Sequence, residues 1–406
     1  MTAFSGQSLK DWLFHLENLH QSTIDMGLER VKAVADQAAL LPLPAKTLLV
    51  GGTNGKGSTC AMLEAMLMEA GYSVAVYSSP HLVDYRERLR INGKLLSEAD
   101  HCAAFAAIEQ ARGETSLTYF EFSTLAALWL CRKHRPDVVI LEVGLGGRLD
   151  ATNIVDADVA LVTSIDLDHQ SFLGDSRESV AREKVGIARA GKPLICGEPE
   201  PTAVFFSEAM RIGAELKLVG RDFQYQAQGE DFSFNGKAWP RPSLPLPNAA
   251  TALAALDALG LAVPDEAKAQ GLAKARLAGR LQQIADSPLI LIDVAHNPHA
   301  ARYLNSELKR RFAGRTIHGV CAMLADKDIE GTLAALNAIG HWYPAELPGV
   351  GRAAPAQRLA KALGSDAVFD DVQLALQAAV QAAAADDVVI VFGSFYTVAQ
   401  VLPQGE

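Results

Sequence analysis

The sequence predicts an α/β protein in which a mainly parallel sheet, covered by helices, is followed by a smaller Rossmann-like α/β domain. Three observations support this fold class. Short apolar runs alternate with longer segments of helical periodicity from Thr47 onward, as in parallel sheets. A glycine-rich turn joins the first apolar run to a helical segment. Apolar strand character restarts at residue 289, after a stretch of different composition.

The first domain is expected to cover residues 1–286. Strands are predicted at residues 47–50, 74–77, 138–143 and 159–165, where β-branched runs end in Gly, Ser or Thr. Alanine-rich segments such as 60–71 and 123–134 lie between them and carry apolar residues at helical spacing. Residues 218–247 are richer in Gly, Pro and aromatic residues and predict a small hairpin.

The second domain is expected to cover residues 287–406. A helical segment at 248–260 precedes it, and a strand at 289–295 opens it. Strands and helices then alternate as far as the apolar run at 388–392. The boundary is placed near residues 283–288.

Composition excludes several classes of protein. The formal net charge is −10 and no basic stripe is present, which argues against a nucleic-acid groove. No apolar run approaches the roughly 18 residues of a membrane helix, and residues 1–20 do not read as a signal peptide. The five cysteines are scattered, so neither a zinc site nor a disulfide framework is expected. The sequence therefore predicts a cytoplasmic globular protein.

The most informative motif is GGTNGKGST, residues 51–59, between a strand and a helix. Glycines let backbone amides approach an anion, and the start of a helix adds a favourable dipole. Lys56 supplies a cation for phosphates, and Ser58 or Thr59 could help to hold a metal ion. The strict P-loop pattern is not met, because Val50 stands at its first glycine position and Gly57 follows the lysine. A glycine turn with a surface lysine is the alternative.

Three further motifs place polar side chains after predicted strands. Ser79 follows 74–77 and is a hard oxygen donor suited to magnesium, although a serine pair also suits a turn. Glu142 lies in an apolar strand and needs a partner, either magnesium or an internal arginine. His169 could be a metal ligand or a structural histidine. Lys184, in REKVGIA, resembles a surface lysine when residue type alone is considered.

Two other sets of charged residues stay open. The arginines at 86, 88 and 90 could form a solvated face or attract an anion. In the second domain, Asp293 lies at the end of a strand, where an acid suits a ribose or phosphate-linked contact, with His296 beside it. Asn297-Pro298 predicts a helix N-cap followed by proline at the first helical position.

Together the motifs GGTNGKGST, YSSPHL, ILEVGLGGRLDATN, TSIDLDH, REKVGIA and DVAHNPHAA resemble the folylpolyglutamate synthase family, within the Mur ligase superfamily. The similarity runs from about residue 16 to residue 401 and is strongest to the bifunctional bacterial type. It implies a P-loop ATPase domain followed by the Rossmann-like domain.

The resemblance also implies roles for individual residues. The catalytic set is Lys56, Glu142, His169 and Lys184, with Lys184 matching a carbamylated lysine. Magnesium would be positioned by Ser79, Glu142 and His169. ATP would contact Asn54, Gly55, Lys56, Gly57, Ser58, Asn248, Arg280, Asp293 and His296. The pteroate would contact Thr23, Ile24, Asp25, Met26, Phe120, Glu121, Leu149, Asp150 and Ala151.

The implied activity is ATP-dependent ligation of L-glutamate to dihydropteroate, giving dihydrofolate, and to reduced folates such as tetrahydrofolates, through an acyl phosphate. Two Mg²⁺ ions, a monovalent cation such as K⁺ and a monomeric state are implied as well, without a nucleic-acid or membrane partner. A muramyl-type peptide ligase and a P-loop small-molecule kinase are the alternatives. A nucleotide-binding module without catalysis is a third.

Overall fold

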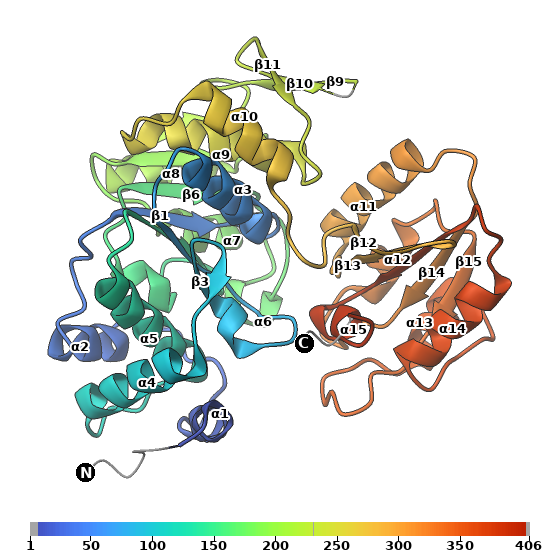
Figure 1. Ribbon diagram of the computed structural model, residues 1–406, viewed down its shortest axis with the longest axis horizontal. Coiled ribbons are helices and arrows are strands. Elements are labelled where there is room, and N and C mark those ends of the chain that lie inside the picture. Colours follow the sequence, from blue (N-terminus) through green and yellow to red (C-terminus); the bar gives the residue numbers. More distant parts are fainter. Residues whose placement is uncertain (1–6, 230, 403–406) are drawn as a thin grey trace. The chain divides into compact units, whose positions relative to one another are not determined.

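The computed structural model describes residues 7–229 and 231–402, which fold into two compact units, Met1–Arg276 and Leu277–Glu406. Each unit has its own sheet and its own hydrophobic core (Figure 1). In the described part of the chain, no helix is both long and apolar enough to cross a bilayer.

The first unit is built on an eight-stranded sheet with the order β4-β3-β2-β5-β1-β6-β7-β8. All neighbours are parallel except β2–β3 and β3–β4, which are antiparallel. The strands are β1 (Lys46–Gly51), β2 (Val74–Tyr77), β3 (Leu89–Ile91), β4 (Lys94–Leu95), β5 (Val138–Glu142), β6 (Val159–Val162), β7 (Pro193–Cys196) and β8 (Glu215–Leu218). The strands expected at 47–50, 74–77, 138–143 and 159–165 are thereby confirmed, with the last ending earlier than predicted.

Helices cover both faces of this sheet. α3 packs on β1, β2 and β5, and α9 packs on β6 and β7, whereas α5 packs on β2 from the other face (Figure 1). The helices are α1 (Leu9–Asn18), α2 (Glu29–Gln37), α3 (Lys56–Glu69), α4 (Glu98–Arg112), α5 (Tyr119–His134), α6 (Gln170–Leu173), α7 (Arg177–Val185), α8 (Ala203–Ile212), α9 (Leu246–Leu259) and α10 (Asp265–Lys274), with 3₁₀ turns η1 (Tyr85–Arg88) and η2 (Ala151–Ile154). Leu49, Leu141 and Phe122 belong to the core that joins the sheet to α5.

Residues 218–247 contain one strand more than the expected hairpin. β9 (Tyr225–Gln228), β10 (Asp231–Phe234) and β11 (Lys237–Pro240) form a separate three-stranded antiparallel sheet. The antiparallel pairing expected of a hairpin was therefore confirmed, but the prediction missed one of the three strands. Phe232 and Trp239 are buried on one side of this small sheet.

The second unit is a five-stranded sheet with the order β12-β13-β16-β14-β15, parallel except for β12 against β13. Its strands are β12 (Gln282–Asp286), β13 (Leu289–Asp293), β14 (Ile317–Cys321), β15 (His341–Pro344) and β16 (Val388–Phe392). Its helices are α11 (Pro298–Arg311), α12 (Ile329–Ala334), α13 (Ala356–Leu363), α14 (Val372–Ala382) and α15 (Phe395–Ala399). Because β12 pairs with β13, the second unit begins before residue 287, where the sequence analysis began the second domain.

Candidate functional site

The glycine-rich loop follows β1 at the carboxyl edge of the large sheet. Gly55 has a left-handed φ of 88°, and a Cβ there would lie 2.5 Å from Asn248 Oδ1. Gly52 has a φ of 141°, and a Cβ there would lie 1.9 Å from Thr163 Oγ1. Only glycine fits both positions, because the loop packs closely against Thr163, directly after β6, and against Asn248 at the start of α9. The structure therefore brings Asn248 beside Gly55, as the resemblance implies for the nucleotide site.

Lys56 lies at the first position of α3 and is half-buried. Its Nζ donates to the carbonyls of Gly52 at 3.0 Å and Thr53 at 3.3 Å. Ser58 is buried in the first turn of the same helix. A lysine held across its own loop, at the start of a helix, places a cation and backbone amides at one point, which suits a phosphate.

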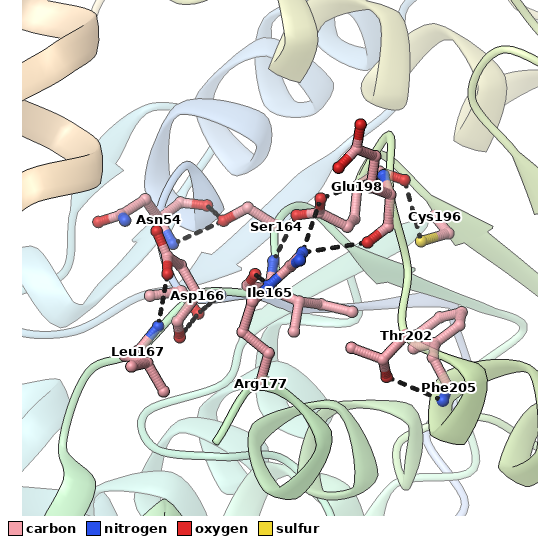
Figure 2. A network of polar contacts seen from close by, with 12 residues as sticks. Asn54, Ser164, Ile165, Asp166, Leu167, Arg177, Cys196, Glu198, Thr202 and Phe205 are labelled. Atoms are coloured by element: carbon pink, nitrogen blue, oxygen red, sulfur yellow. Dashed lines mark hydrogen bonds and ion pairs between the residues drawn. The ribbon is translucent and has the colours of Figure 1, made fainter. Parts of the chain in front are cut away.

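Figure 2 shows how the loop after β1 is joined to the loops after β6 and β7. Asn54 N donates to Ser164 Oγ at 3.0 Å. Ile165 N donates to Glu198 Oε2 at 2.9 Å, and Arg177 pairs with Glu198 Oε1 at 3.1 Å. Arg177 Nε also donates to the carbonyl of Ile165 at 3.0 Å. These contacts therefore connect the loops that follow the neighbouring parallel strands β1, β6 and β7 at this edge of the sheet.

The predicted metal ligands are distributed along the same edge. Ser79 follows β2, Glu142 ends β5 and His169 follows β6, while β1 lies between β5 and β6. Glu142 is buried, and Arg90 lies within electrostatic reach of it. Both partners considered for Glu142, a metal ion and an internal arginine, therefore remain compatible with the structure. His169 adopts a left-handed φ of 49° where α6 begins.

The donor set fits a hard divalent cation in part. A serine hydroxyl and a carboxylate are oxygen donors of the kind magnesium takes, whereas an imidazole is a weaker match. Among residues 7–229 and 231–402, no three His, Cys, Asp or Glu side chains gather as a ready metal site. The predicted set contains two such side chains and a serine, so its role as a metal site stays a prediction.

Lys184 is not a surface lysine. It lies in α7 and is only 3% exposed. Burial and the nearby Lys56 together lower its pKa to about 7, against the opposing effect of Asp168. Two lysines from different helices thus lie within electrostatic reach of each other. Such a pair favours an anion between or beside them. Sequence reasoning missed Asp168, although it directly precedes His169 in the TSIDLDH motif.

The loop after β5 is organised by Asp150. Its Oδ2 accepts hydrogen bonds from Gly144 N at 3.0 Å and Leu145 N at 2.9 Å, and its Oδ1 accepts from Thr152 N and Oγ1. Burial raises its pKa, and these hydrogen bonds oppose that rise. Asp150 therefore shapes the loop, and Leu149 and Ala151 flank it.

Two of the other predicted pteroate residues, Met26 and Phe120, lie against this loop. A Cβ at Gly144 would lie 2.6 Å from the Phe120 ring. A Cβ at Gly146 would lie 2.9 Å from Leu173 and 3.5 Å from Met26 Cε. Thr23, Ile24 and Asp25 are exposed, and Glu121 is buried at the start of α5. The structure thus brings Met26 and Phe120 to one glycine-rich surface, and Leu173 joins them without a signal in the sequence.

In the second unit, Asp293 ends β13 and its carboxylate is a backbone acceptor. Oδ2 accepts from Leu281 N at 2.9 Å and Oδ1 from Ala295 N at 2.8 Å, and burial raises its pKa against the effect of nearby Arg280. The Arg280 guanidinium lies over the Phe395 ring at 5.5 Å. His296 Nδ1 lies 2.9 Å from the Val294 carbonyl. Arg280, Asp293 and His296 therefore lie together at the carboxyl end of β13.

The N-cap prediction for the next helix is confirmed. Asn297 caps α11 by accepting from Ala300 N at 2.9 Å, and Pro298 takes the first position of the helix.

Comparisons with known proteins agree with the motifs. The model of the Mur ligase middle domain matches residues 50–196, and that of the Mur ligase glutamate ligase domain matches residues 279–395. The dihydrofolate synthase/folylpolyglutamate synthase of Escherichia coli (strain K12) is 52% identical, over 99% of this chain and 96% of the relative.

Two solved structures match throughout. The structure of E. coli FolC in complex with DHPP and ADP has a TM-score of 0.96 and 52% identity, and the match covers 98% of each chain. A bifunctional folylpolyglutamate synthase/dihydrofolate synthase with Mn, AMPPNP and L-glutamate bound has a TM-score of 0.93 and 50% identity, covering 99% of this chain and 98% of the other. Solved relatives thus hold a nucleotide, and one of them a divalent metal ion.

These matches confirm the resemblance drawn from the motifs and the expected fold class. They favour it over a muramyl-type peptide ligase or a P-loop small-molecule kinase, because the similarity to bifunctional enzymes spans both units. The chain belongs to the dihydrofolate synthase/folylpolyglutamate synthase family of Mur ligases.

Proposed function

We propose that this chain is an ATP-dependent ligase that adds L-glutamate to dihydropteroate, giving dihydrofolate, and to tetrahydrofolates, lengthening their glutamate tail. The observation that carries this proposal is that buried Lys184 lies within electrostatic reach of Lys56 in the glycine-rich loop, at the sheet edge that also holds Ser79 and Glu142. This edge can gather the negative charge of a transferring phosphoryl group, which is what such ligases must stabilise.

The residues of this chain would act as follows. The substrate carboxylate attacks the γ-phosphate of ATP, and an acyl phosphate and ADP form. Lys56 and the amides of the loop stabilise charge on the phosphoryl oxygens during this transfer. The amine of glutamate then attacks the activated carbonyl carbon, an amide bond forms, and phosphate leaves. Asn248, Arg280, Asp293 and His296 are proposed to contact the nucleotide.

Magnesium, when bound, would neutralise phosphate charge, with Ser79, Glu142 and His169 as its protein contacts. Two Mg²⁺ ions and a monovalent cation such as K⁺ belong to the same proposal. So do a monomeric state and a cytoplasmic location, the latter consistent with five cysteines that form no disulfide.

Lys184 is proposed to carry a carbamate. A neutral amine must attack the carbon of CO₂, losing one proton as the N–C bond forms and leaving an anionic carbamate. Burial lowers the pKa of Lys184 to about 7, which supplies the neutral amine near physiological pH. The carbamate would place negative charge beside Lys56, where the two cations otherwise repel each other.

The proposal is tested by release of phosphate from ATP in the presence of glutamate, with dihydropteroate or tetrahydrofolate as the acceptor. We expect turnover with both, and mass spectrometry should show products longer by whole glutamyl units. Lys56→Met is the matched negative control and should fold normally while losing turnover. Phosphate release with neither acceptor, under conditions in which a relative is active, would contradict the proposal.

The carbamate is tested separately. Lys184→Ala should lose activity that added bicarbonate does not restore, because the amine that accepts CO₂ is gone. Short carboxylic acids, which can occupy the vacated space with a carboxylate, should restore part of it. If neither short acids in the variant nor bicarbonate in the wild type change the rate, the carbamate role has no support.

A further inference from the structure

Residues 20–28 join α1 to α2 without forming a helix or strand. Thr23, Ile24 and Asp25 are exposed, and Met26 is half-buried. A segment of this kind is positioned by its side-chain contacts, because it has neither a strand ladder nor helical hydrogen bonds to hold it. What holds it matters, since Met26 lies near Gly146 of the loop after β5.

Arg30, in the first turn of α2, contacts both this segment and α5. Its Nη1 lies 2.6 Å from Asp25 Oδ2, and its Nη2 donates to the Asp25 carbonyl at 3.1 Å. The same Nη2 lies 3.0 Å from Glu121 Oε1. The planar fork of a guanidinium can serve several acceptors in fixed directions, which an ammonium cannot do. Arg30 therefore links Asp25 to the start of α5 through ion pairs with Asp25 and Glu121.

The α5 side of this contact is rigid. Glu121 is 3% exposed, and its Oε2 accepts from Thr118 N at 2.8 Å in a capping box at the start of the helix. A carboxylate buried to this degree needs a cation or several hydrogen bonds, and Arg30 supplies the charge. Glu121 thus gives Arg30 a buried, hydrogen-bonded partner in α5.

The Asp25 carboxylate has a second partner, His20. His20 Nε2 lies 3.2 Å from Asp25 Oδ2, and His20 Nδ1 lies 2.7 Å from Ser116 Oγ. Asp25 is therefore held from both sides, by Arg30 toward α5 and by His20 toward Ser116, which precedes α5 in the chain. Asp25 is thus the polar attachment of the 20–28 segment, beside the apolar packing of Met26 and Leu28 against the core.

We infer that Arg30 is a positioning residue that sets the distance between Met26 and Phe120, and hence the width of the site for the pteroate part of the substrate. Phe120 precedes Glu121 in α5, and its ring lies against Gly144, whereas Met26 follows the attachment point Asp25 and lies near Gly146. Arg30 itself does not contact the reacting atoms. The inference rests on the proposed function, because that function identifies Met26 and Phe120 as pteroate contacts.

Arg30→Met tests it by removing the charge and the fork while keeping an apolar stem. We expect KM for dihydropteroate to rise about tenfold or more, equivalent to about 1.4 kcal/mol, with kcat and KM for ATP nearly unchanged. Arg30→Lys should give an intermediate KM. Arg310→Met is the matched control, because Arg310 also pairs with a buried glutamate, through Nη2 to Glu307 Oε2 at 2.8 Å, within α11 of the second unit. The control should leave KM for dihydropteroate unchanged.

Hydrogen exchange of the backbone amides of residues 20–28, in the full chain without ligand, provides a readout that does not depend on turnover. Arg30→Met should speed this exchange, and Arg310→Met should not. Asp25→Asn keeps the Arg30–Glu121 pair intact and should also speed the exchange of residues 20–28. This variant replaces Arg30→Met in the test if Arg30→Met does not fold. Unchanged exchange and an unchanged KM in a folded Arg30 or Asp25 variant would overturn the inference. If the wild type fails to use dihydropteroate, the proposed function fails, while exchange still reports whether Arg30 holds the segment.

Discussion

At Gly55 two physical constraints coincide, and they can be separated by substitution. The backbone has a φ of 88°, and the Asn248 side chain occupies the space that a Cβ would take. Gly55→Ala should therefore cost about 1–2 kcal/mol for the left-handed backbone and more for displacing Asn248. We expect a marked loss of affinity for ATP, measured with a fluorescent nucleotide analogue, together with a lower melting temperature.

Gly71 provides the control for this prediction. It has the same φ of 88°, and a Cβ there would meet nothing within 4 Å. Gly71→Ala should lower the melting temperature through the backbone alone and leave nucleotide affinity unchanged. Equal effects of the two substitutions on nucleotide binding would show that the approach of Asn248 to the loop is unimportant.

The buried amine of Lys184 predicts an unusual dependence of stability on pH. Its pKa is about 7 in the folded chain, against 10.5 for an ordinary lysine. Between these values the unfolded chain binds one more proton, so the free energy of unfolding rises with pH in this range. Below pH 7 both states are protonated and the penalty of burying the charge is complete, on the order of 3–5 kcal/mol.

Lys184→Met should remove this penalty. In buffers depleted of CO₂, which keep the amine uncarbamylated, the variant should exceed the wild type in unfolding free energy at pH 6–7. Its advantage should shrink as the pH approaches 10. Urea denaturation at several pH values measures this difference, and a difference that does not vary with pH would contradict the buried, neutralised state of Lys184.

At the scale of secondary-structure elements, the buried ion pair between α3 and β3 lies within electrostatic reach of Glu142, a proposed metal contact. Arg90 Nη2 lies 2.8 Å from Glu64 Oε2. Burial lowers the pKa of Arg90, but the Glu64 carboxylate and other nearby groups outweigh this effect, so the pKa is raised above its ordinary value. Of the arginines at 86, 88 and 90, this one is therefore not part of a solvated face. Arg86 pairs with Asp84, and Arg88 donates to His81 Nδ1 at 2.9 Å.

Breaking this pair should cost more than removing it. Arg90→Met leaves the buried Glu64 carboxylate without its cation and should destabilise the chain by roughly 3 kcal/mol, whereas Arg90→Met combined with Glu64→Leu should recover part of that loss. The four unfolding free energies of a double-mutant cycle measure it. A double variant no more stable than Arg90→Met alone would mean that the loss comes from packing and not from the unpaired charge.

How far elements could be predicted depended on their burial. The central strands were predicted because parallel strands covered on both faces consist of uninterrupted apolar residues. β4 has only two residues, both exposed, and β12 (QQIAD) has no buried residue and no alternation, so neither gave a signal. The third strand at 225–240, β11, was missed for a related reason, since it has four residues and only Trp239 among them is buried.

Over the whole molecule, the sequence located the strand-end residues of the candidate site but not their partners. Asn54, Lys56 and Glu142 stand beside recognisable strand and glycine patterns. Glu198 and Arg30 do not, because their contacts with Ile165 and Glu121 arise only when segments distant in sequence are folded together. The burial of Lys184 was likewise invisible, since a helical lysine is usually exposed.

Both units contain residues that are proposed to take part in the reaction, which leads to a final prediction. The glycine-rich loop, Lys184 and the pteroate residues belong to the first unit, whereas Arg280, Asp293 and His296 belong to the second. Each unit has its own sheet and core, so residues 1–276 and 277–406, produced separately, should each unfold cooperatively. Neither should release phosphate in a glutamate-dependent way, because each lacks residues that the ligase reaction is proposed to need. Thermal melts followed by circular dichroism test the folding, and phosphate release tests the chemistry. Glutamate-dependent turnover by residues 1–276 alone would show that Arg280, Asp293 and His296 are dispensable, and the nucleotide contacts would then have to be sought entirely within the first unit.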